Sequence, residues 1–280
     1  MKLGQRLVLK YIRTKFKILS SISKRKAAEK AYKLFCSPQY RNKKKLPPIF
    51  EKAEKLHLPF EEVILRGYRW NHPSENKVLI LHGFESSVIN FDRYVKPLVK
   101  KGYEVLAFDA PAHGRSTGKM INAIIYKDMI HKINKVYGPV KFFLAHSFGG
   151  LAVSLYLEET IHDETYKVVL IAPAVETTTA ADSYFKFLKL DKELRKEFDK
   201  MIEELAGKPM TWYSISRASQ KIKAKVLFLQ DKDDEMTPLK DVEPIIKMAY
   251  SHFQFIISEG LGHRRIYRDN KTAKTIIDFL

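Results

Sequence analysis

Residues 141–150 read KFFLAHSFGG, a short apolar run followed by a polar turn and two glycines. The run over 141–144 predicts a buried strand, and the residues from Gly149 onward have the pattern of a helix. Ser147 would then occupy a sharp strand-to-helix turn, whose strained backbone needs small neighbours such as Ala145 and Gly149. Such a turn can present a serine hydroxyl as a nucleophile, but a serine at an ordinary helix start would look the same. Other segments must distinguish the two.

The chain from Phe60 onward alternates between short apolar runs and amphipathic segments of helix length. This alternation favours an α/β fold, in which helices cover both faces of a parallel sheet. Strands are predicted at residues 63–68, 77–81, 104–109, 141–144, 168–171, 226–230 and 253–257, and helices at 91–101, 121–136, 149–158, 240–251 and 271–280.

The interval 174–224 lies between two predicted strands and is too long for a simple crossover. Its pattern predicts helices near 184–190, 192–205 and 211–221. Because open α/β sheets hold ligands at the carboxyl ends of their strands, we expect this interval to be a small helical lid inserted over that edge.

The segment Leu81-His82-Gly83-Phe84 follows a predicted strand and supplies a second element of the chemistry. A tetrahedral intermediate at Ser147 needs backbone N–H donors aimed at its oxyanion, and the candidates are the N–H groups of Phe84 and Phe148. Gly83 lets the chain approach the serine closely. We expect His82 to be a structural hydrogen-bonding residue and not a base.

Three aspartates, Asp231, Asp233 and Asp234, follow the apolar strand 226–230. A carboxylate here can reach a histidine from the next strand-loop, hold its tautomer and stabilise its charged form. Asp234 is favoured because it lies four residues before Pro238, the position that usually supplies the acid. The other two are alternatives, and those that do not serve are expected to be solvated turn residues.

His263 lies in a glycine-containing loop after the last predicted strand, and none of the other eight histidines follows that strand in this way. Its ordinary pKa, about 6.5, suits a general base near neutral pH. Ser147, Asp234 and His263 thus occur in that chain order, each after a predicted strand, which is the order of α/β-hydrolases and differs from that of other serine hydrolase folds.

The segment DAPAHGRS, residues 109–116, is similar to the DxPGHGxS loop of the α/β-hydrolase superfamily, with Ala112 in place of a glycine. Together with the motifs above, it makes residues 81–280 resemble that superfamily. The closing GLGHRRIYRD, residues 260–269, resembles more narrowly a group of poorly characterised bacterial α/β-hydrolases. The resemblance implies a mostly parallel eight-stranded sheet over residues 46–280, with 63–68 in its antiparallel beginning.

For the reaction, the resemblance implies a two-step acyl transfer through an acyl-Ser147 intermediate, with no metal or organic cofactor. The leading interpretation is a carboxylic-ester hydrolase acting on a small-molecule ester or acyl substrate. A peptidase or amidase is the enzymatic alternative, with Glu203 and Glu204 available to bind a free amine. A non-catalytic membrane-associated or partner-binding protein on a hydrolase scaffold is the other alternative.

Residues 1–45 carry 15 Lys or Arg against one acid, Glu29, so most of the formal charge of +18 lies in this basic arm. An amphipathic helix is predicted over 1–23. The arm could pack on the domain, attach to an anionic membrane surface or serve as a matrix-targeting presequence. Nucleic acid is not expected, because no base-reading module is visible. The apolar face groups Leu3, Leu7, Tyr11, Ile18 and Ile22, and the basic face groups Lys2, Arg6, Lys10, Arg13 and Lys17.

Cys36 is the single cysteine, so an internal disulfide is excluded and a reducing compartment is favoured over secretion. No run approaches the ~20 apolar residues that span a bilayer, and the basic residues interrupt any apolar core of a signal peptide. We therefore expect a cytoplasmic protein, with the basic arm able to hold it at the inner face of the membrane.

Overall fold

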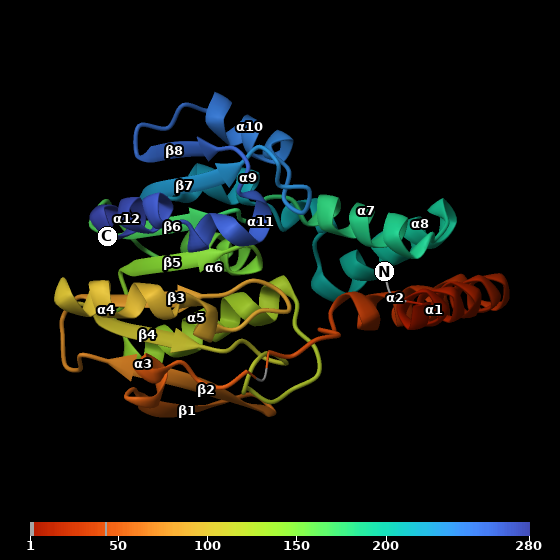
Figure 1. Ribbon diagram of the computed structural model, residues 1–280. Coiled ribbons are helices and arrows are strands. Elements are labelled where there is room, and N and C mark those ends of the chain that lie inside the picture. Colours follow the sequence, from red (N-terminus) through yellow and green to blue (C-terminus); the bar gives the residue numbers. More distant parts are fainter. Residues whose placement is uncertain (1–2, 43) are drawn as a thin grey trace. The chain divides into compact units, whose positions relative to one another are not determined.

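One eight-stranded sheet dominates the computed structural model, which describes residues 3–42 and 44–280 (Figure 1). The strand order is β1-β2-β4-β3-β5-β6-β7-β8. Only the β1–β2 and β2–β4 pairs are antiparallel, so the predicted mostly parallel eight-stranded sheet is confirmed. The strands are β1 Glu54–Phe60, β2 Val63–Trp70, β3 Lys77–Leu81, β4 Glu104–Phe108, β5 Phe142–His146, β6 Lys167–Ile171, β7 Lys225–Asp231 and β8 Phe253–Ser258.

The first strand corrects the prediction, which placed no strand before residue 63. β1 alternates along its length, with Leu56, Leu58 and Phe60 buried and the residues between them exposed. Pro59 obscures this pattern, since proline cannot donate to a ladder. It is tolerated because β1 is an edge strand that pairs only with β2.

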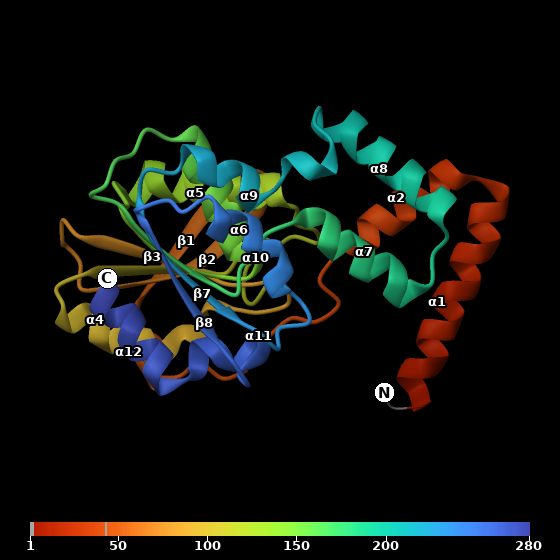
Figure 2. The same ribbon diagram turned by 90° about the horizontal axis from the view of Figure 1, so that it is seen from above.

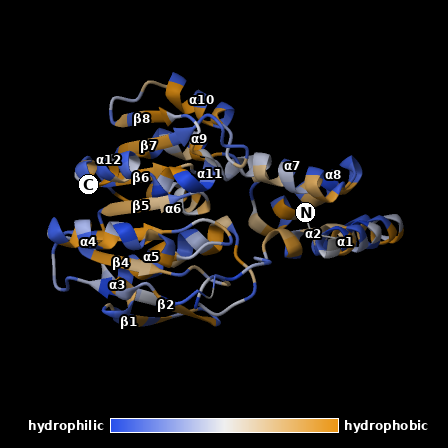
Figure 3. Cartoon of the chain, viewed as in Figure 1, coloured by the Kyte–Doolittle hydropathy of each residue, from blue (hydrophilic) through white to orange (hydrophobic). Residues whose placement is uncertain are grey.

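Helices cover both faces of the sheet, as the alternating pattern predicted. Figure 2 shows α4 and α12 on one face and α5 and α6 on the other. The parallel strands between these layers are almost wholly buried, and they are the apolar bands at the centre of the sheet in Figure 3. The elements of this part are α3 Pro48–Glu51, η1 Val88–Phe91, α4 Asp92–Lys100, α5 Ala123–Tyr137, α6 Phe148–Glu159, α9 Ile215–Ala218, η3 Ser219–Lys221, α10 Leu239–Lys247, α11 Gly262–Arg265, η4 Ile266–Arg268 and α12 Asn270–Phe279.

A second, helical unit combines the chain up to Ser37 with Glu176–Tyr213, whereas the sheet unit comprises Pro38–Val175 and Ser214–Leu280. The predicted divisions were an arm over 1–45 and an insertion over 174–224. The structure draws both boundaries differently, because helices from the two segments share one hydrophobic core. The helices of this unit are α1 Leu3–Ile22, α2 Lys24–Phe35, α7 Thr177–Leu188, α8 Lys192–Ala206 and η2 Met210–Trp212.

The core of the helical unit depends on small residues of α2 that let aromatic side chains approach. Ala27, Ala28 and Ala31 are fully buried, and Phe198 of α8 packs among them. The Phe198 ring makes an edge contact with Phe35, with centroids 5.9 Å apart. Neither chain segment could bury its apolar side chains in this core alone.

The helix α1 forms as predicted, and the face that it buries is not the apolar face identified from the sequence. Leu9 and Phe16 enter the core of the helical unit. The predicted apolar face, represented by Leu7, Tyr11 and Ile18, is exposed instead. Lys2 of the predicted basic face and Lys43 of the basic arm lie outside the described residues. Within 3–42 and 44–280, no helix combines the length and apolar character needed to cross a bilayer.

Candidate active site

Ser147 lies at the turn from β5 into α6, where the sequence placed it. Its φ of 53° and ψ of −119° are strained for a residue with a side chain. Its N–H donates to Ile171 O at 3.0 Å, which fixes the turn to β6. A Cβ on Gly149 would lie 2.8 Å from Leu81 O, so only glycine lets α6 start this close to β3.

The structure brings the predicted histidine and acid to this serine. His263 Nε2 lies 3.0 Å from Ser147 Oγ, and His263 Nδ1 lies 2.8 Å from Asp234 Oδ2. An ionised carboxylate can only accept, so the proton on the ring is at Nδ1 and Nε2 is free to accept from the serine hydroxyl. The three side chains therefore form one directed chain of hydrogen bonds across the carboxyl edge of β5, β7 and β8.

Asp234 is buried, and its carboxylate accepts several hydrogen bonds. Its Oδ1 accepts the N–H groups of Met236 and Thr237, each at 2.9 Å. Burial acts to raise the pKa of Asp234, but the hydrogen bond from His263 and the bonds from Thr237 outweigh it, so the pKa is lower than usual and the carboxylate is ionised.

Thr237 is a site residue that the sequence analysis missed. Its hydroxyl donates to Asp234 Oδ2 at 2.7 Å and lies 3.2 Å from His263 Nδ1. It thereby fixes the orientation of the carboxylate toward the imidazole. Its position could have indicated this role, because Thr237 lies directly before Pro238, in the same turn from which Asp234 was predicted as the acid.

The backbone of Gly83 and Phe84 passes directly beside Ser147. A Cβ on Gly83 would lie 2.9 Å from Ser147 Cβ and 3.4 Å from Ser147 Oγ. Phe148 is the first residue of α6, so its N–H has no acceptor within the helix. The rings of Phe84 and Phe148 meet edge to face with centroids 6.1 Å apart. The Phe148 N–H thus lies directly after the serine without a helical acceptor, and the oxyanion role of Phe84 and Phe148 stays a prediction.

A family model described as serine aminopeptidase, S33, matches residues 72–212, half of the chain. The chain belongs to this family. It is accordingly a member of the α/β-hydrolase superfamily, and its fold agrees with that membership. The matched residues include Ser147, Phe84 and Phe148 but end before Asp234 and His263.

Two relatives resemble this hydrolase over much of its length. One is the uncharacterized protein YqkD of Bacillus subtilis (strain 168), 26% identical over 82% of this chain and 81% of the relative. The other is the bifunctional esterase/perhydrolase DCH of Acinetobacter calcoaceticus, 26% identical over 56% of this chain and 60% of that protein.

Solved structures share the fold. The Pyrococcus furiosus esterase Pf2001 matches with a TM-score of 0.64 at 21% identity, covering 88% of this chain and 97% of that one. The monoacylglycerol lipase of Paleococcus ferrophilus matches with a TM-score of 0.58 at 22% identity, covering 76% of this chain and 97% of that one.

In this hydrolase the two aspartates beside Asp234 differ: Asp233 is an exposed turn residue, as predicted, whereas Asp231 is buried at the end of β7, which corrects the prediction for Asp231. Asp231 is fully buried and accepts the N–H groups of Leu261 and Gly262 at 3.1 and 2.9 Å. Asp233 is exposed, yet its Oδ2 accepts the Gly260 N–H at 2.8 Å. Both carboxylates hold the loop that carries the histidine. Asp231 ends β7 opposite Ser258 of β8, and this pairing, invisible in the sequence, gives it that reach.

His82 and His113 support the loop beside the serine. His82 donates from Nδ1 to Gly83 O at 2.7 Å and accepts the Ala110 N–H at Nε2, so its predicted structural role is confirmed. His113, which the sequence analysis did not single out, accepts the Glu85 N–H at 2.9 Å. Burial lowers the pKa of His82 to about 4 and that of His113 to about 3, so both rings are neutral.

His146, next to the nucleophile, was also missed. It is buried, and its Nε2 donates to the backbone oxygen of His263 at 3.0 Å, which anchors the histidine loop to β5. Burial, followed by the neighbouring His263 ring, lowers the pKa of His146 to about 3. Within the described ranges, no three His, Cys, Asp or Glu side chains are grouped so that they could hold a metal ion.

Proposed function

We propose that this chain is a serine hydrolase that cleaves carboxylic esters through an acyl intermediate on Ser147. The observation that carries the proposal is the hydrogen-bonded chain from Ser147 Oγ through His263 to Asp234, with separations of 3.0 and 2.8 Å. Nucleophile, base and orienting acid at these distances are the arrangement that acyl transfer requires.

The first step forms the acyl-enzyme. Ser147 Oγ attacks the ester carbonyl while His263 Nε2 takes the hydroxyl proton, and Asp234 stabilises the resulting imidazolium. The negative charge on the carbonyl oxygen is met by the N–H groups of Phe84 and Phe148. As the intermediate collapses, the bond to the alcohol oxygen breaks and His263 returns its proton to that oxygen.

The second step releases the acid. Water replaces the alcohol, His263 Nε2 takes one of its protons, and the remaining hydroxide attacks the acyl carbon. The bond to Ser147 Oγ then breaks and Oγ recovers the proton from His263. The carboxylic acid leaves, and the three side chains return to the state that the structure describes.

An ester substrate is supported by what similar proteins are called, since those with a named activity include an esterase/perhydrolase, an esterase and a monoacylglycerol lipase. One of the two carboxylates considered for a peptidase, Glu204, offers less support. Glu204 pairs with Arg25 at 2.6 Å within the helical unit and is therefore already neutralised.

Turnover of p-nitrophenyl butyrate and of the matching p-nitroanilide tests the proposal. Wild type should hydrolyse the ester much faster than the anilide. Ser147→Ala should lower ester turnover by at least about 10⁴-fold, because the nucleophile is lost. Ser251→Ala, at an exposed serine of the same unit, is the control and should keep full activity. A folded Ser147→Ala protein with wild-type turnover would contradict the proposal. If wild type cleaves the anilide faster than the ester, the protein is an amidase and not an esterase.

A further inference from the structure

The helix α1 has apolar side chains on two opposite faces, and the helical unit buries only one of them. At about 100° per residue, Leu9 and Phe16 fall on the buried side. The opposite face carries five large apolar side chains that are each more than half exposed. These five, the α1 stripe, are Leu7, Val8, Tyr11, Ile18 and Ile22.

An exposed stripe of this size is unusual. Single apolar side chains are common on protein surfaces, but several large ones on one helix face mark a surface that binds something apolar. The stripe extends from Leu7 to Ile22 within a helix of 20 residues, and one exposed lysine, Lys15, lies in its middle with Nζ 5.9 Å from the centroid of the Tyr11 ring. It is therefore long enough to lie along an apolar layer.

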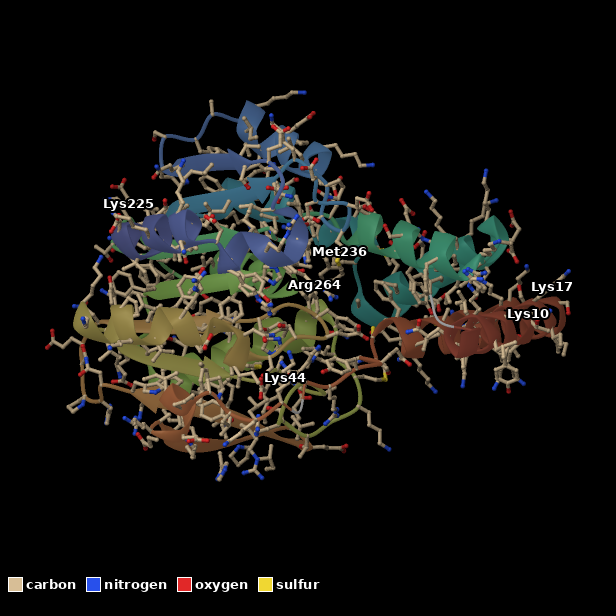
Figure 4. All side chains as sticks on the ribbon, in the orientation of Figure 1. Lys10, Lys17, Lys44, Lys225, Met236 and Arg264 are labelled. Carbon is tan, nitrogen blue, oxygen red and sulfur yellow. The ribbon has the colours of Figure 1, made fainter. Side chains whose placement is uncertain are left out.

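Basic side chains flank the α1 stripe, and they are not neutralised by the fold. Arg6, Lys10 and Lys17 make no salt bridge to any residue of the described ranges, and Figure 4 shows Lys10 and Lys17 on α1. Neighbouring basic residues differ, since Lys24 pairs with Asp191 at 3.2 Å and Arg25 with Glu204 at 2.6 Å. The positive charge beside the stripe is thus available to an external anion.

We propose that α1 lies in the headgroup region of an anionic lipid bilayer, with the α1 stripe in the apolar boundary and Arg6, Lys10 and Lys17 against lipid phosphates. An amphipathic helix with a basic flank binds such a surface through both contributions at once. A second copy of the chain is a poorer partner for the stripe, because it would bring two strongly basic arms together. Nucleic acid would use the charge but leave the stripe in water.

Sedimentation of the full-length protein with phosphatidylcholine vesicles, with and without phosphatidylglycerol, tests the proposal. Wild type should bind the anionic vesicles and bind the neutral ones much more weakly. Ile18→Ser/Ile22→Ser should lower the partition coefficient by at least about tenfold, because two apolar side chains no longer leave water. Ile161→Ser, at a side chain that is 97% exposed in the sheet unit, is the matched control and should bind as wild type.

The contribution of charge to vesicle binding is tested by a second variant and its matched control. Lys10→Gln/Lys17→Gln should weaken binding to anionic vesicles by about tenfold, whereas Lys225→Gln, at an exposed lysine of the sheet unit, should change it little. All α1 variants should keep wild-type turnover of a dissolved ester. Ser147→Ala should bind vesicles normally, so that failure of this proposal and failure of the esterase proposal are distinguishable.

Three results would overturn the lipid proposal. In the first, Ile18→Ser/Ile22→Ser binds anionic vesicles as well as wild type. In the second, duplex DNA binds as tightly as the vesicles and only the lysine variants lose it, which would identify a polyanion site. In the third, wild type is a dimer by light scattering and Ile18→Ser/Ile22→Ser is a monomer, which would assign the stripe to a second copy.

Discussion

The sheet unit and the helical unit bury their apolar residues by different routes. In the sheet unit each central strand is apolar along its own length, as in Val78–Leu81 of β3, which is fully buried. In the helical unit the core forms only when residues near 9–35 meet residues near 181–210. The first kind of core is local in sequence and the second is not, and the proposed chemistry depends on the first.

The largest expected effect is on the reaction at the edge of the sheet. His263→Ala should lower ester turnover by at least about 10⁴-fold, because Ser147 loses the acceptor for its proton. Steady-state kinetics with a p-nitrophenyl ester measures this. His252→Ala, another histidine of the sheet unit outside the site, is the control. Retained turnover in folded His263→Ala would show that the hydrogen-bonded chain does not carry the reaction.

The next effect concerns the core of the helical unit. Phe198→Ala should cost about 3–5 kcal/mol, because a fully buried ring is removed from between α2 and α7. Hydrogen exchange should show lost protection in α2 and α8 and unchanged protection in β3 and β5. Equal loss in both units would mean that the two cores unfold as one.

The third effect is the pH dependence of stability. It should differ between the two units, because every histidine of the chain lies in the sheet unit. His82, His113 and His146 are held neutral, with pKa values of about 4, 3 and 3. Unfolded histidine takes up a proton below about pH 6.5. The stability that these rings contribute is therefore complete above that pH and is lost as the pH falls toward their folded pKa values.

Between pH 7 and pH 5 each such ring should lower the unfolding free energy of the sheet unit by about 1–2 kcal/mol. His113→Gln should reduce this loss, as measured by urea unfolding at the two pH values. His57, which is exposed in the fold, meets water in both states, so His57→Gln is the control. An identical pH dependence in wild type and His113→Gln would show that the ring is not held neutral.

The smallest effect distinguishes the two faces of α1. Ile18→Ser should change the unfolding free energy by less than about 0.5 kcal/mol, since the side chain is exposed. Phe16→Ala, on the buried face, should cost about 3 kcal/mol or more. Urea unfolding followed by helical circular dichroism measures both. A large loss in Ile18→Ser would place the α1 stripe inside a core.

Most of the sheet could be predicted from the sequence, because each strand is a local apolar run that ends in a turn. It also placed Ser147, Asp234 and His263, since each follows such a run. The role of Asp231 escaped prediction because it depends on which strands become neighbours, whereas Thr237 was missed although it lies in the same turn as Asp234. The pairing of β7 with β8 brings Asp231 to the loop of Gly262, and no local pattern contains that pairing.

The helical unit was harder to predict for a related reason. The sequence analysis identified one apolar face on α1, and it missed the face of Leu9 and Phe16 that enters the core. Part of what covers that face, the helix α7, lies more than 150 residues away along the chain. The stripe chosen from the sequence was the larger one, and it is the one left in water.

Covalent labelling tests the central claim most directly. Wild-type protein is treated with a fluorophosphonate, and the modified residue is located by peptide mass spectrometry. The hydrogen-bonded chain to His263 and Asp234 predicts a single adduct on Ser147, much slower to form in His263→Ala. A folded protein that takes no label, or that is labelled on a serine other than Ser147, would contradict it.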